Sequence, residues 1–370
     1  MTKLCIIYNT APRYREAIFS AIDAEYDCDW YFGRTKSDIK EMDTSLLKRV
    51  TYYETVGNPD KLYWKRGLLR LLLRKDYCNF FMLAEVRSVT DWFFLWLAAT
   101  FFPKKRVYLW THGWYGRESG IIARLKLWSF GHVAGTFVYG DRARCLLIEQ
   151  GIDADKLWAI HNSLHYDEQL AIRNGLKRTA RYVEHFGNTD PVLVFIGRLT
   201  AVKRLDMLID ALAMLRQQGC VVNAVLVGDG TERCRLEQMV SIKGLADKVW
   251  FYGASYGESE NAQLLYDADL CVSPGNVGLT AIHAMTFGTP VVSHNQFENQ
   301  MPEFEAIKPG VTGDFFEHGD VAQLAFTIAR WLDNHKTDRE KVRQNCYEEI
   351  DTKWNPHYQI DLIRKKLKLV

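Results

Sequence analysis

The sequence of 370 residues lacks the features that mark several common classes of protein. Its eight cysteines are scattered without a C-x-x-C pair or another metal-ligand spacing, which excludes a zinc ribbon and a small disulfide-stapled module. No apolar run reaches the ~20 residues that a membrane-spanning helix needs. The apolar part of the amino terminus, MTKLCIIYNT, is too short for a signal peptide. We therefore expect reduced thiols and a cytoplasmic protein, with peripheral attachment to the inner face of the membrane as an open alternative.

Fingerprints of nucleotide-binding enzymes with a cofactor are missing as well. The sequence has no P-loop, and its glycine-rich turns do not form the G-x-G-x-x-G that would hold a redox dinucleotide. Internal repeats and low-complexity tracts are also absent. These absences disfavour an oxidoreductase, and we expect neither a cofactor nor a nucleic-acid partner.

The composition indicates two ordinary globular domains that differ in charge. A length of 370 residues with 48% hydrophobic and 25% charged residues suits about two domains. Residues 1–165 carry 24 Lys and Arg against 18 Asp and Glu, whereas the remainder carries 23 against 27. Eight of the 11 tryptophans also lie in the first half. A basic, Trp-rich half favours an anionic partner or a membrane surface.

Two apolar stretches of the first half bear on that partner. The segment Lys61–Lys75 reads as a basic amphipathic helix, with Arg66, Arg70 and Arg74 on one face, a pattern typical of helices on anionic membranes. A surface helix that packs on its own domain is the alternative. The segment 89–102 is very apolar but too short to span a bilayer, so we expect a helix buried beside the sheet.

The stretch 270–294, LCVSPGNVGLTAIHAMTFGTPVVSH, has the pattern of one βαβ unit. An apolar strand leads into a turn around Asn276, a short helix follows, and Gly288 with Pro290 ends the helix before the next strand. The turn offers the N–H groups of Val277, Gly278 and Leu279 at a helix start, where anions such as diphosphates bind.

Two further strands are expected to end beside this turn. VLVFIGRLTAVK places Gly197, Arg198 and Lys203 after one strand, and AVLVGDG ends another in a Gly-Asp-Gly turn. Ligands of open parallel sheets bind beyond the carboxyl ends of the strands. The two cations would therefore lie beside the anion site.

Taken together, these motifs resemble the retaining family-4 glycosyltransferases. GRLTAVKRLDMLIDAL, VGDG, VWFYG, SPGNVGLTAIHAMTFGTPVV and PGVTGDFF occur in that family's order and spacing, over Pro191 to about Leu332. The resemblance implies an α/β fold of two Rossmann-like domains facing across a cleft, called GT-B. It implies that Arg198 and Lys203 grip the diphosphate of a nucleotide sugar. It also implies that the exit of the strand ending at Gly253 faces the base.

One departure from the family's pattern concerns its two glutamates, E-x7-E. Aligned on the Ala-Met and Gly-x-Pro that follow, their positions are Gly275 and His283 here. The first glutamate normally touches the donor sugar and the second the ribose. A neutral imidazole at His283 can replace the second. For the first, either another residue takes over, or the donor sugar differs, or activity is lost. Glu303 and Glu305 are the candidates to take over, and solvated loop carboxylates are the alternative for both.

The first half contributes further candidates. Arg13 and Arg15 follow the first strand and suit an anionic acceptor, or are plain surface charges. His112 follows a strand and precedes a glycine, and the resemblance implies a contact with the donor sugar there; a local hydrogen bond to the backbone is the alternative. Glu118, in the same loop, suits either the acceptor or a local capping role.

We expect residues 1–165 to form the acceptor-side domain and 166–190 to be a linker. Residues 191–352 would form the donor domain, and a helix at 353–370 would pack back on the first. The implied activity is transfer of a sugar, with its anomeric configuration retained, to a glycan or lipid-linked acceptor. Because no carboxylate cluster accompanies the turn, we expect no metal. A non-catalytic nucleotide-sugar-binding partner subunit and a nucleotide-sugar epimerase remain alternatives.

Overall fold

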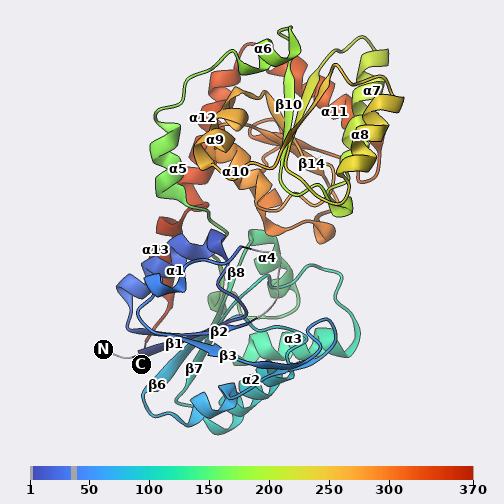
Figure 1. Cartoon of the computed structure of the whole chain (residues 1–370). Helices are drawn as coiled ribbons and strands as arrows, with labels where there is room; N and C mark the ends of the chain where they lie inside the picture. The colour runs from blue at the N-terminus through green and yellow to red at the C-terminus, as the bar shows by residue number, and fades with distance from the viewer. Residues whose placement is uncertain (1–2, 35–39, 370) are drawn as a thin grey trace. The chain divides into compact units, whose positions relative to one another are not determined.

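The chain divides into two compact units. The computed structural model describes residues 3–34 and 40–369. Unit 1 comprises Met1–His165 with Asn355–Val370, and unit 2 comprises Tyr166–Trp354 (Figure 1). Each unit holds a parallel sheet covered by helices, which confirms the predicted class of two Rossmann-like units.

Unit 1 is built on a seven-stranded parallel sheet of order β3-β2-β1-β6-β7-β8-β9. Its strands are β1 (Lys3–Tyr8), β2 (Cys28–Gly33), β3 (Val50–Tyr53), β6 (Tyr77–Met82), β7 (Arg106–Thr111), β8 (Gly135–Val138) and β9 (Leu157–Ala159). Its helices are α1 (Glu16–Glu25), α2 (Val89–Phe101), α3 (Gly120–His132), α4 (Asp141–Glu149) and α13 (Pro356–Lys366). A small antiparallel ribbon joins β4 (Thr55–Gly57) to β5 (Tyr63–Lys65).

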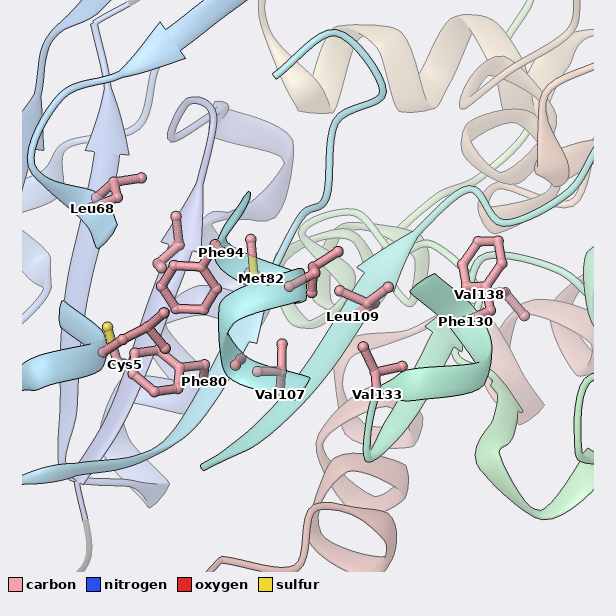
Figure 2. Packing of buried hydrophobic residues seen from close by; sticks show 14 of the residues in the cluster. Cys5, Leu68, Phe80, Met82, Phe94, Val107, Leu109, Phe130, Val133 and Val138 are labelled. Atoms are coloured by element: carbon pink, nitrogen blue, oxygen red, sulfur yellow. The ribbon is translucent and has the colours of Figure 1, made fainter. Parts of the chain in front are cut away.

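The two faces of this sheet have separate cores. On one face, α1 and α13 pack through Ile18, Phe19 and Ile363. On the other, α2, α3 and α4 bury apolar side chains against the strands, and Figure 2 shows Phe94 of α2 beside Phe80 and other strand residues. Burial on both faces is the usual requirement of a parallel sheet.

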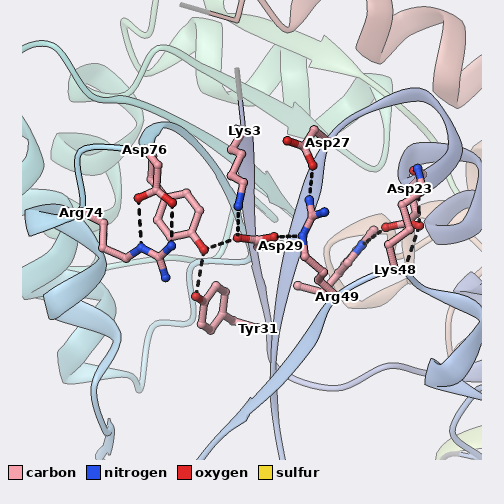
Figure 3. Close-up of polar contacts among 11 residues, drawn as sticks. Lys3, Asp23, Asp27, Asp29, Tyr31, Lys48, Arg49, Arg74 and Asp76 are labelled. Atoms are coloured by element: carbon pink, nitrogen blue, oxygen red, sulfur yellow. Dashed lines mark hydrogen bonds and ion pairs between the residues drawn. The ribbon is translucent and has the colours of Figure 1, made fainter. Parts of the chain in front are cut away.

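Ion pairs and hydrogen bonds stabilise the amino ends of the first strands (Figure 3). The Asp29 carboxylate accepts from the Tyr77 hydroxyl and from Arg49, and Lys3 lies 3.4 Å away. Burial by itself would raise the pKa of Asp29, but these donors outweigh burial and lower it. This network lies where the strands begin, whereas ligands of such sheets bind where they end.

Unit 2 has a six-stranded parallel sheet of order β12-β11-β10-β13-β14-β15. The strands are β10 (Val192–Ile196), β11 (Asn223–Val227), β12 (Val249–Gly253), β13 (Leu270–Val272), β14 (Val291–His294) and β15 (Gly313–Phe316). The helices are α5 (Tyr166–Arg173), α6 (Arg181–Phe186), α7 (Leu205–Gln217), α8 (Arg233–Ile242), α9 (Glu258–Asp267), α10 (Thr280–Thr286), α11 (Val321–Asn334) and α12 (Arg339–Lys353).

The segment 166–190, expected to be a linker, is part of unit 2. It folds as α5 and α6, and the Arg173 guanidinium holds the Asp351 carboxylate at 2.8 and 3.0 Å. Thr179 donates to Asp267 through both its backbone and its side chain. These contacts come from residues distant in sequence, so composition alone did not reveal them.

The predicted helix at Lys61–Lys75 is wrong. The segment instead forms β5, a left-handed Gly67 with φ 85° and a short 3₁₀ helix, η3 (Leu68–Leu73). The Lys65 ammonium is fully buried and pairs with Glu85 at 2.9 Å and with Asp91 at 2.8 Å, which holds β5 against α2. The three arginines therefore do not share a helix face, and the basis for that membrane contact is lost.

The apolar segment 89–102 does form a helix, α2, which the Ser88 hydroxyl caps by accepting from the Asp91 N–H at 3.2 Å. Its expected burial is only half right, because Phe93, Trp96 and Phe101 are exposed. One face is enough to cover the sheet, so the other face remains outside. None of the described helices is long and apolar enough to cross a bilayer.

Candidate functional site

The strand order of unit 2 reverses between β10 and β13, which places a switch point there. Gly197 follows β10, and residues 273–279 follow β13. The Thr280 hydroxyl donates to the Ile196 carbonyl at 3.1 Å and so joins the start of α10 to the end of β10. Crevices at such switch points are the usual ligand sites of doubly wound sheets.

Two cations and one carboxylate gather at this point. The Lys203 ammonium, in the short 3₁₀ helix η5 (Ala201–Lys203), donates to the Asn276 carbonyl at 2.6 Å. Burial lowers the pKa of Lys203, while the Glu303 carboxylate raises it and Arg198 lowers it further. Since Arg198 is exposed, the pair offers one fixed and one accessible positive charge to an anion.

Gly275 cannot carry a side chain in this backbone. Its N–H donates to the Lys203 carbonyl at 3.0 Å, so the two loops run backbone to backbone. A Cβ at position 275 would lie 2.0 Å from the Val202 carbonyl oxygen. The glutamate that the resembled family has here is therefore excluded by the packing of the loop itself.

The N–H groups of the turn differ from the expectation at one residue. The Val277 N–H donates to the Gln300 side chain at 2.9 Å, so the prediction that it faces an anion is wrong. Gln300 in turn donates to Ser293 at 2.8 Å. The N–H groups of Gly278 and Leu279 have no acceptor within the part of the chain that the structure describes.

His283 lies on α10 and contacts a residue that the sequence did not indicate. Its Nε2 is 3.0 Å from Oε1 of Glu258, and the same oxygen accepts from the Gln169 amide at 2.7 Å. Glu258 begins α9, 25 residues before His283. No local pattern links two such positions, so sequence reasoning missed Glu258.

The remaining donor-side candidates lie at loop or helix positions of unit 2. Gly253 ends β12 with φ 92°. Glu303 and Glu305 are both in the 3₁₀ helix η7 (Pro302–Ala306), where Glu303 is buried and Glu305 is half-buried. Of the two, only the Glu303 carboxylate contributes to the pKa of Lys203, which it raises.

Unit 1 contains a cavity of about 540 Å³ at the carboxyl ends of β1, β6 and β7. Its strand order also reverses, between β1 and β6. Eight aromatic side chains are among those that line it: Tyr8, Tyr14, Tyr53, Tyr63, Trp92, Tyr115, Phe130 and Tyr139. The polar side chains include Arg15, Glu85, His112 and Lys126. An aromatic cavity with a few polar groups is typical of a small-molecule site.

Arg15 is part of the wall of this cavity rather than a surface charge. Its side chain is 4% exposed, and its guanidinium packs over Trp110 at 4.7 Å and Tyr139 at 4.8 Å. It donates to the Tyr139 hydroxyl and to the Asn162 side chain. Arg13 is exposed and does not line the cavity, so the structure separates the two arginines.

His112 follows β7 and lines the cavity. Burial, followed by the positive charges of Arg15 and Lys126, lowers its pKa to about 4, so the ring is neutral near pH 7. Its Nδ1 is buried without a hydrogen-bond partner among the described residues. A neutral imidazole there can donate to or accept from a substrate hydroxyl.

Two carboxylates of unit 1 have contrasting surroundings. Glu118 accepts from the N–H groups of Tyr115 and Gly116 and pairs with Lys126 at 2.7 Å, which gives it the local capping role. Glu85 lines the cavity and accepts from the Tyr63 hydroxyl at 2.6 Å. Sequence reasoning missed Glu85, because its partners come from other elements.

Comparison with known families bears on unit 2. Residues 177–349 match the family described as glycosyl transferases group 1. This part of the chain, which lies within unit 2, is therefore similar to the glycosyl transferases group 1. The cations at 198 and 203 and the turn at 273–279 all lie inside the matched residues.

Two characterised glycosyltransferases are similar to part of the chain. The alpha-D-kanosaminyltransferase of Streptomyces kanamyceticus is 28% identical over 173 residues, which are 46% of this chain and 43% of that relative. A GDP-mannose-dependent alpha-(1-6)-phosphatidylinositol dimannoside mannosyltransferase of Mycobacterium tuberculosis is 36% identical over 120 residues, 31% of this chain and 30% of the relative. The chain thus spans less than half the length of these curated relatives.

Solved structures extend the likeness to the fold of both units. HepE of Anabaena, in complex with UDP, has a TM-score of 0.71 at 18% identity, over 99% of each chain. The lipopolysaccharide outer core galactosyltransferase WaaB in its apo form has a TM-score of 0.70 at 15% identity, over 98% of this chain and 99% of that one. At these identities the likeness concerns the GT-B fold alone.

Proposed function

We propose that the protein is a retaining glycosyltransferase that moves a sugar from a nucleoside-diphosphate sugar to a hydroxyl of a glycan or lipid-linked acceptor. The expected setting is cytoplasmic, in the synthesis of cell-surface polysaccharide or another glycoconjugate. The observation that carries the proposal is the gathering of Arg198, Lys203 and the N–H groups of Gly278 and Leu279 at the switch point of unit 2. UDP in the complex of HepE, a similar fold, supports a nucleotide donor.

The chemical role of these groups follows from their charge. As the bond from sugar to diphosphate breaks, negative charge grows on the leaving diphosphate and the sugar becomes oxocarbenium-like. Cations and N–H donors that are already in place stabilise that charge without reorganising. Burial lowers the pKa of Lys203. A bound diphosphate would counteract this shift, because a negative charge nearby favours the charged form of the lysine.

The cavity of unit 1 is the acceptor side of the proposal. Its aromatic side chains offer flat apolar faces to sugar rings, while Glu85 and the neutral His112 offer hydrogen bonds to hydroxyls. Glu85 is held by Tyr63, Lys65 and Asn9, so its orientation is fixed before a substrate enters. The buried Arg15 contributes the fixed wall against which an acceptor packs.

A partner subunit that binds a nucleotide sugar without transferring it is the second candidate. The observation in its favour is Gly275, where the packing of the backbone leaves no room for the side chain of a glutamate. Donor binding with no transfer to any acceptor would indicate this role. Conversion of the donor alone into an epimer would indicate the third alternative, an epimerase.

The experiment that tests the proposal is transfer of a labelled sugar from a panel of UDP- and GDP-sugars to free and lipid-linked glycans. We expect one donor to give a glycosylated product.

Treatment with EDTA should leave the initial rate within about twofold, because Arg198 and Lys203 take the place of a metal at the diphosphate. Loss of the rate on chelation, restored by magnesium or manganese, would contradict the metal-independent part.

A further inference from the structure

The outer face of α2 is apolar and uncovered in unit 1. Phe93, Trp96 and Phe101 are 47%, 45% and 60% exposed. Trp96 and Phe101 lie edge to face with their rings 5.6 Å apart, and Phe93 lies 6.0 Å from the ring of Trp64. The sequence from Trp92 to Pro103 contains no charged residue. Exposed aromatic groups that contact one another form a patch rather than isolated residues.

The elements beside α2 carry further exposed apolar side chains. The 3₁₀ helix η3 and the helix α3 both contact α2. Leu73 of η3 is 71% exposed, and Ile121 of α3 is 75% exposed. Ile122 and Leu125 of α3 are exposed as well. Exposed apolar surface of this kind is typical of sites that contact a protein or a membrane.

The charge of the same region selects between these partners. Residues 61–132 carry 13 Lys and Arg and only 4 Asp and Glu, a net charge of +9 in a chain whose total is +2. All four acidic residues form ion pairs: Glu85 and Asp91 with Lys65, Glu118 with Lys126, and Asp76 with Arg74. Arg70, Lys104 and Arg124 are exposed on or beside the elements that carry the patch.

We propose that the outer face of α2, with η3 and α3, docks on an anionic lipid bilayer. Tryptophan and phenylalanine side chains insert at the headgroup boundary, and lysine and arginine side chains near an anionic surface add electrostatic attraction. A second copy of this chain would bring another strongly positive surface against the first, so self-association through this face is opposed by charge. The basic surface lies on η3 and α3 around α2, and not on a helix at Lys61–Lys75.

Flotation with vesicles tests this proposal on the full chain. We expect the protein to float with vesicles of phosphatidylcholine containing about one third phosphatidylglycerol, to float poorly with phosphatidylcholine alone, and to be released by salt. The variant Phe93→Glu/Phe101→Glu should lose at least about tenfold in binding, because both side chains would enter the headgroup region as charges. Both positions are exposed, so circular dichroism and the melting temperature should be those of the parent.

The matched control is Ile242→Glu, which changes an apolar residue that is 85% exposed at the end of α8 in unit 2. It should bind vesicles as the parent does. Equal binding of the Phe93→Glu/Phe101→Glu variant would overturn the proposal, as would equal affinity for neutral and anionic vesicles. A concentration-dependent dimer that this variant abolishes would show instead that the face joins two copies.

A second inference is carried by the contact between Glu258 and His283, and it rests on the proposed donor site. A carboxylate can only accept, so the His283 Nε2 that lies 3.0 Å from Glu258 must carry the hydrogen. In the neutral ring Nδ1 is then the acceptor, and no described residue donates a hydrogen bond to it. The Gln169 amide holds the same carboxylate oxygen from the other side.

We infer that Glu258 is a positioning residue that fixes this tautomer, so that Nδ1 of His283 accepts a hydrogen bond from a hydroxyl of the bound nucleotide sugar. A glutamate at 283 could accept the same bond, but it would face the Glu258 carboxylate. The two like charges would repel and disturb the site. The pairing thus explains why histidine and Glu258 occur together in this chain.

Nitrogen NMR of the ring and nucleotide titration together test the role of Glu258. The free protein should show His283 protonated at Nε2, and Glu258→Ala should lose that preference. His283→Glu should weaken binding of UDP or GDP at least about tenfold, and adding Glu258→Gln should recover most of the loss. No recovery in the double variant, or a ring protonated at Nδ1 in the parent, would overturn the inference. Failure of the parent to bind either nucleotide would overturn the donor site itself.

Discussion

Replacing Arg198 or Lys203 with alanine should lower kcat/KM for sugar transfer roughly 30- to 800-fold in each variant. This corresponds to a loss of about 2–4 kcal/mol of transition-state stabilisation, as when one hydrogen-bond donor to a developing anion is removed. Arg198 is exposed, so its removal should leave the melting temperature nearly unchanged. Lys203 donates to Asn276, so a small loss of stability is expected there. Single-turnover kinetics with the donor of the parent enzyme would measure the effect.

The matched control for these two variants is Arg204→Gln. Arg204 is the next residue along the chain, is exposed, and pairs with Asp206 at 3.2 Å. Its removal deletes one positive charge from the same segment without touching the turn at 273–279. A loss of rate equal to that of Arg198→Ala would show that overall charge, and not a specific grip on the diphosphate, supports the reaction.

Replacing Gly275 with glutamate, the residue of the resembled family, should unfold the donor loop rather than improve the enzyme. The new Cβ would lie 2.0 Å from the Val202 carbonyl oxygen and 2.8 Å from the Lys203 carbonyl carbon. Neither is a flexible side chain, so the two loops must separate, at a free-energy cost of about 3 kcal/mol. Urea unfolding of the variant and titration with UDP or GDP would measure the loss of stability and of binding.

Gly275→Ala separates the steric cause from the charge. Because alanine adds the same Cβ without a carboxylate, it should lose nearly as much stability as the glutamate variant. An alanine variant as stable as the parent, or a glutamate variant with a higher transfer rate, would show that the loop has room and that the steric account is mistaken.

Much of the fold could be read from the sequence because parallel strands are short, fully apolar runs that end in recognisable turns. VLVFI and AVLV are buried throughout, and the turns after them lie where their glycines and cations indicate. The order of the strands then follows from general rules for doubly wound sheets. Positions such as Arg198 and Lys203 depend only on where a strand ends.

The rest depended on partners that are distant in sequence. The arginines of Lys61–Lys75 are spaced as in a helix, but Lys65 is held by Glu85 and Asp91, and Gly67 is left-handed. From the sequence, the Val277 N–H was expected to face an anion, but it donates to the side chain of Gln300, 23 residues further along the chain. In each case a hydrogen bond or ion pair from another element decided the outcome, and periodicity carries no information about such partners.

The exposed face of α2 illustrates the same limit from the other side. A predominantly apolar segment is expected to be buried, yet only the face with Phe94 and Leu95 meets the sheet. Which face of such a helix remains outside depends on the neighbours that cover it, and those come from β5, η3 and α3.

The central claim is that this chain transfers a sugar from a nucleoside diphosphate with retention at the anomeric carbon. The most direct measurement is NMR of the product formed from an α-linked nucleotide sugar and a glycan acceptor. The account predicts a new α-glycosidic linkage, together with one equivalent of free nucleoside diphosphate. A β-linked product would contradict retention, and a donor that binds but is never transferred to any acceptor would contradict the claim that the protein is an enzyme.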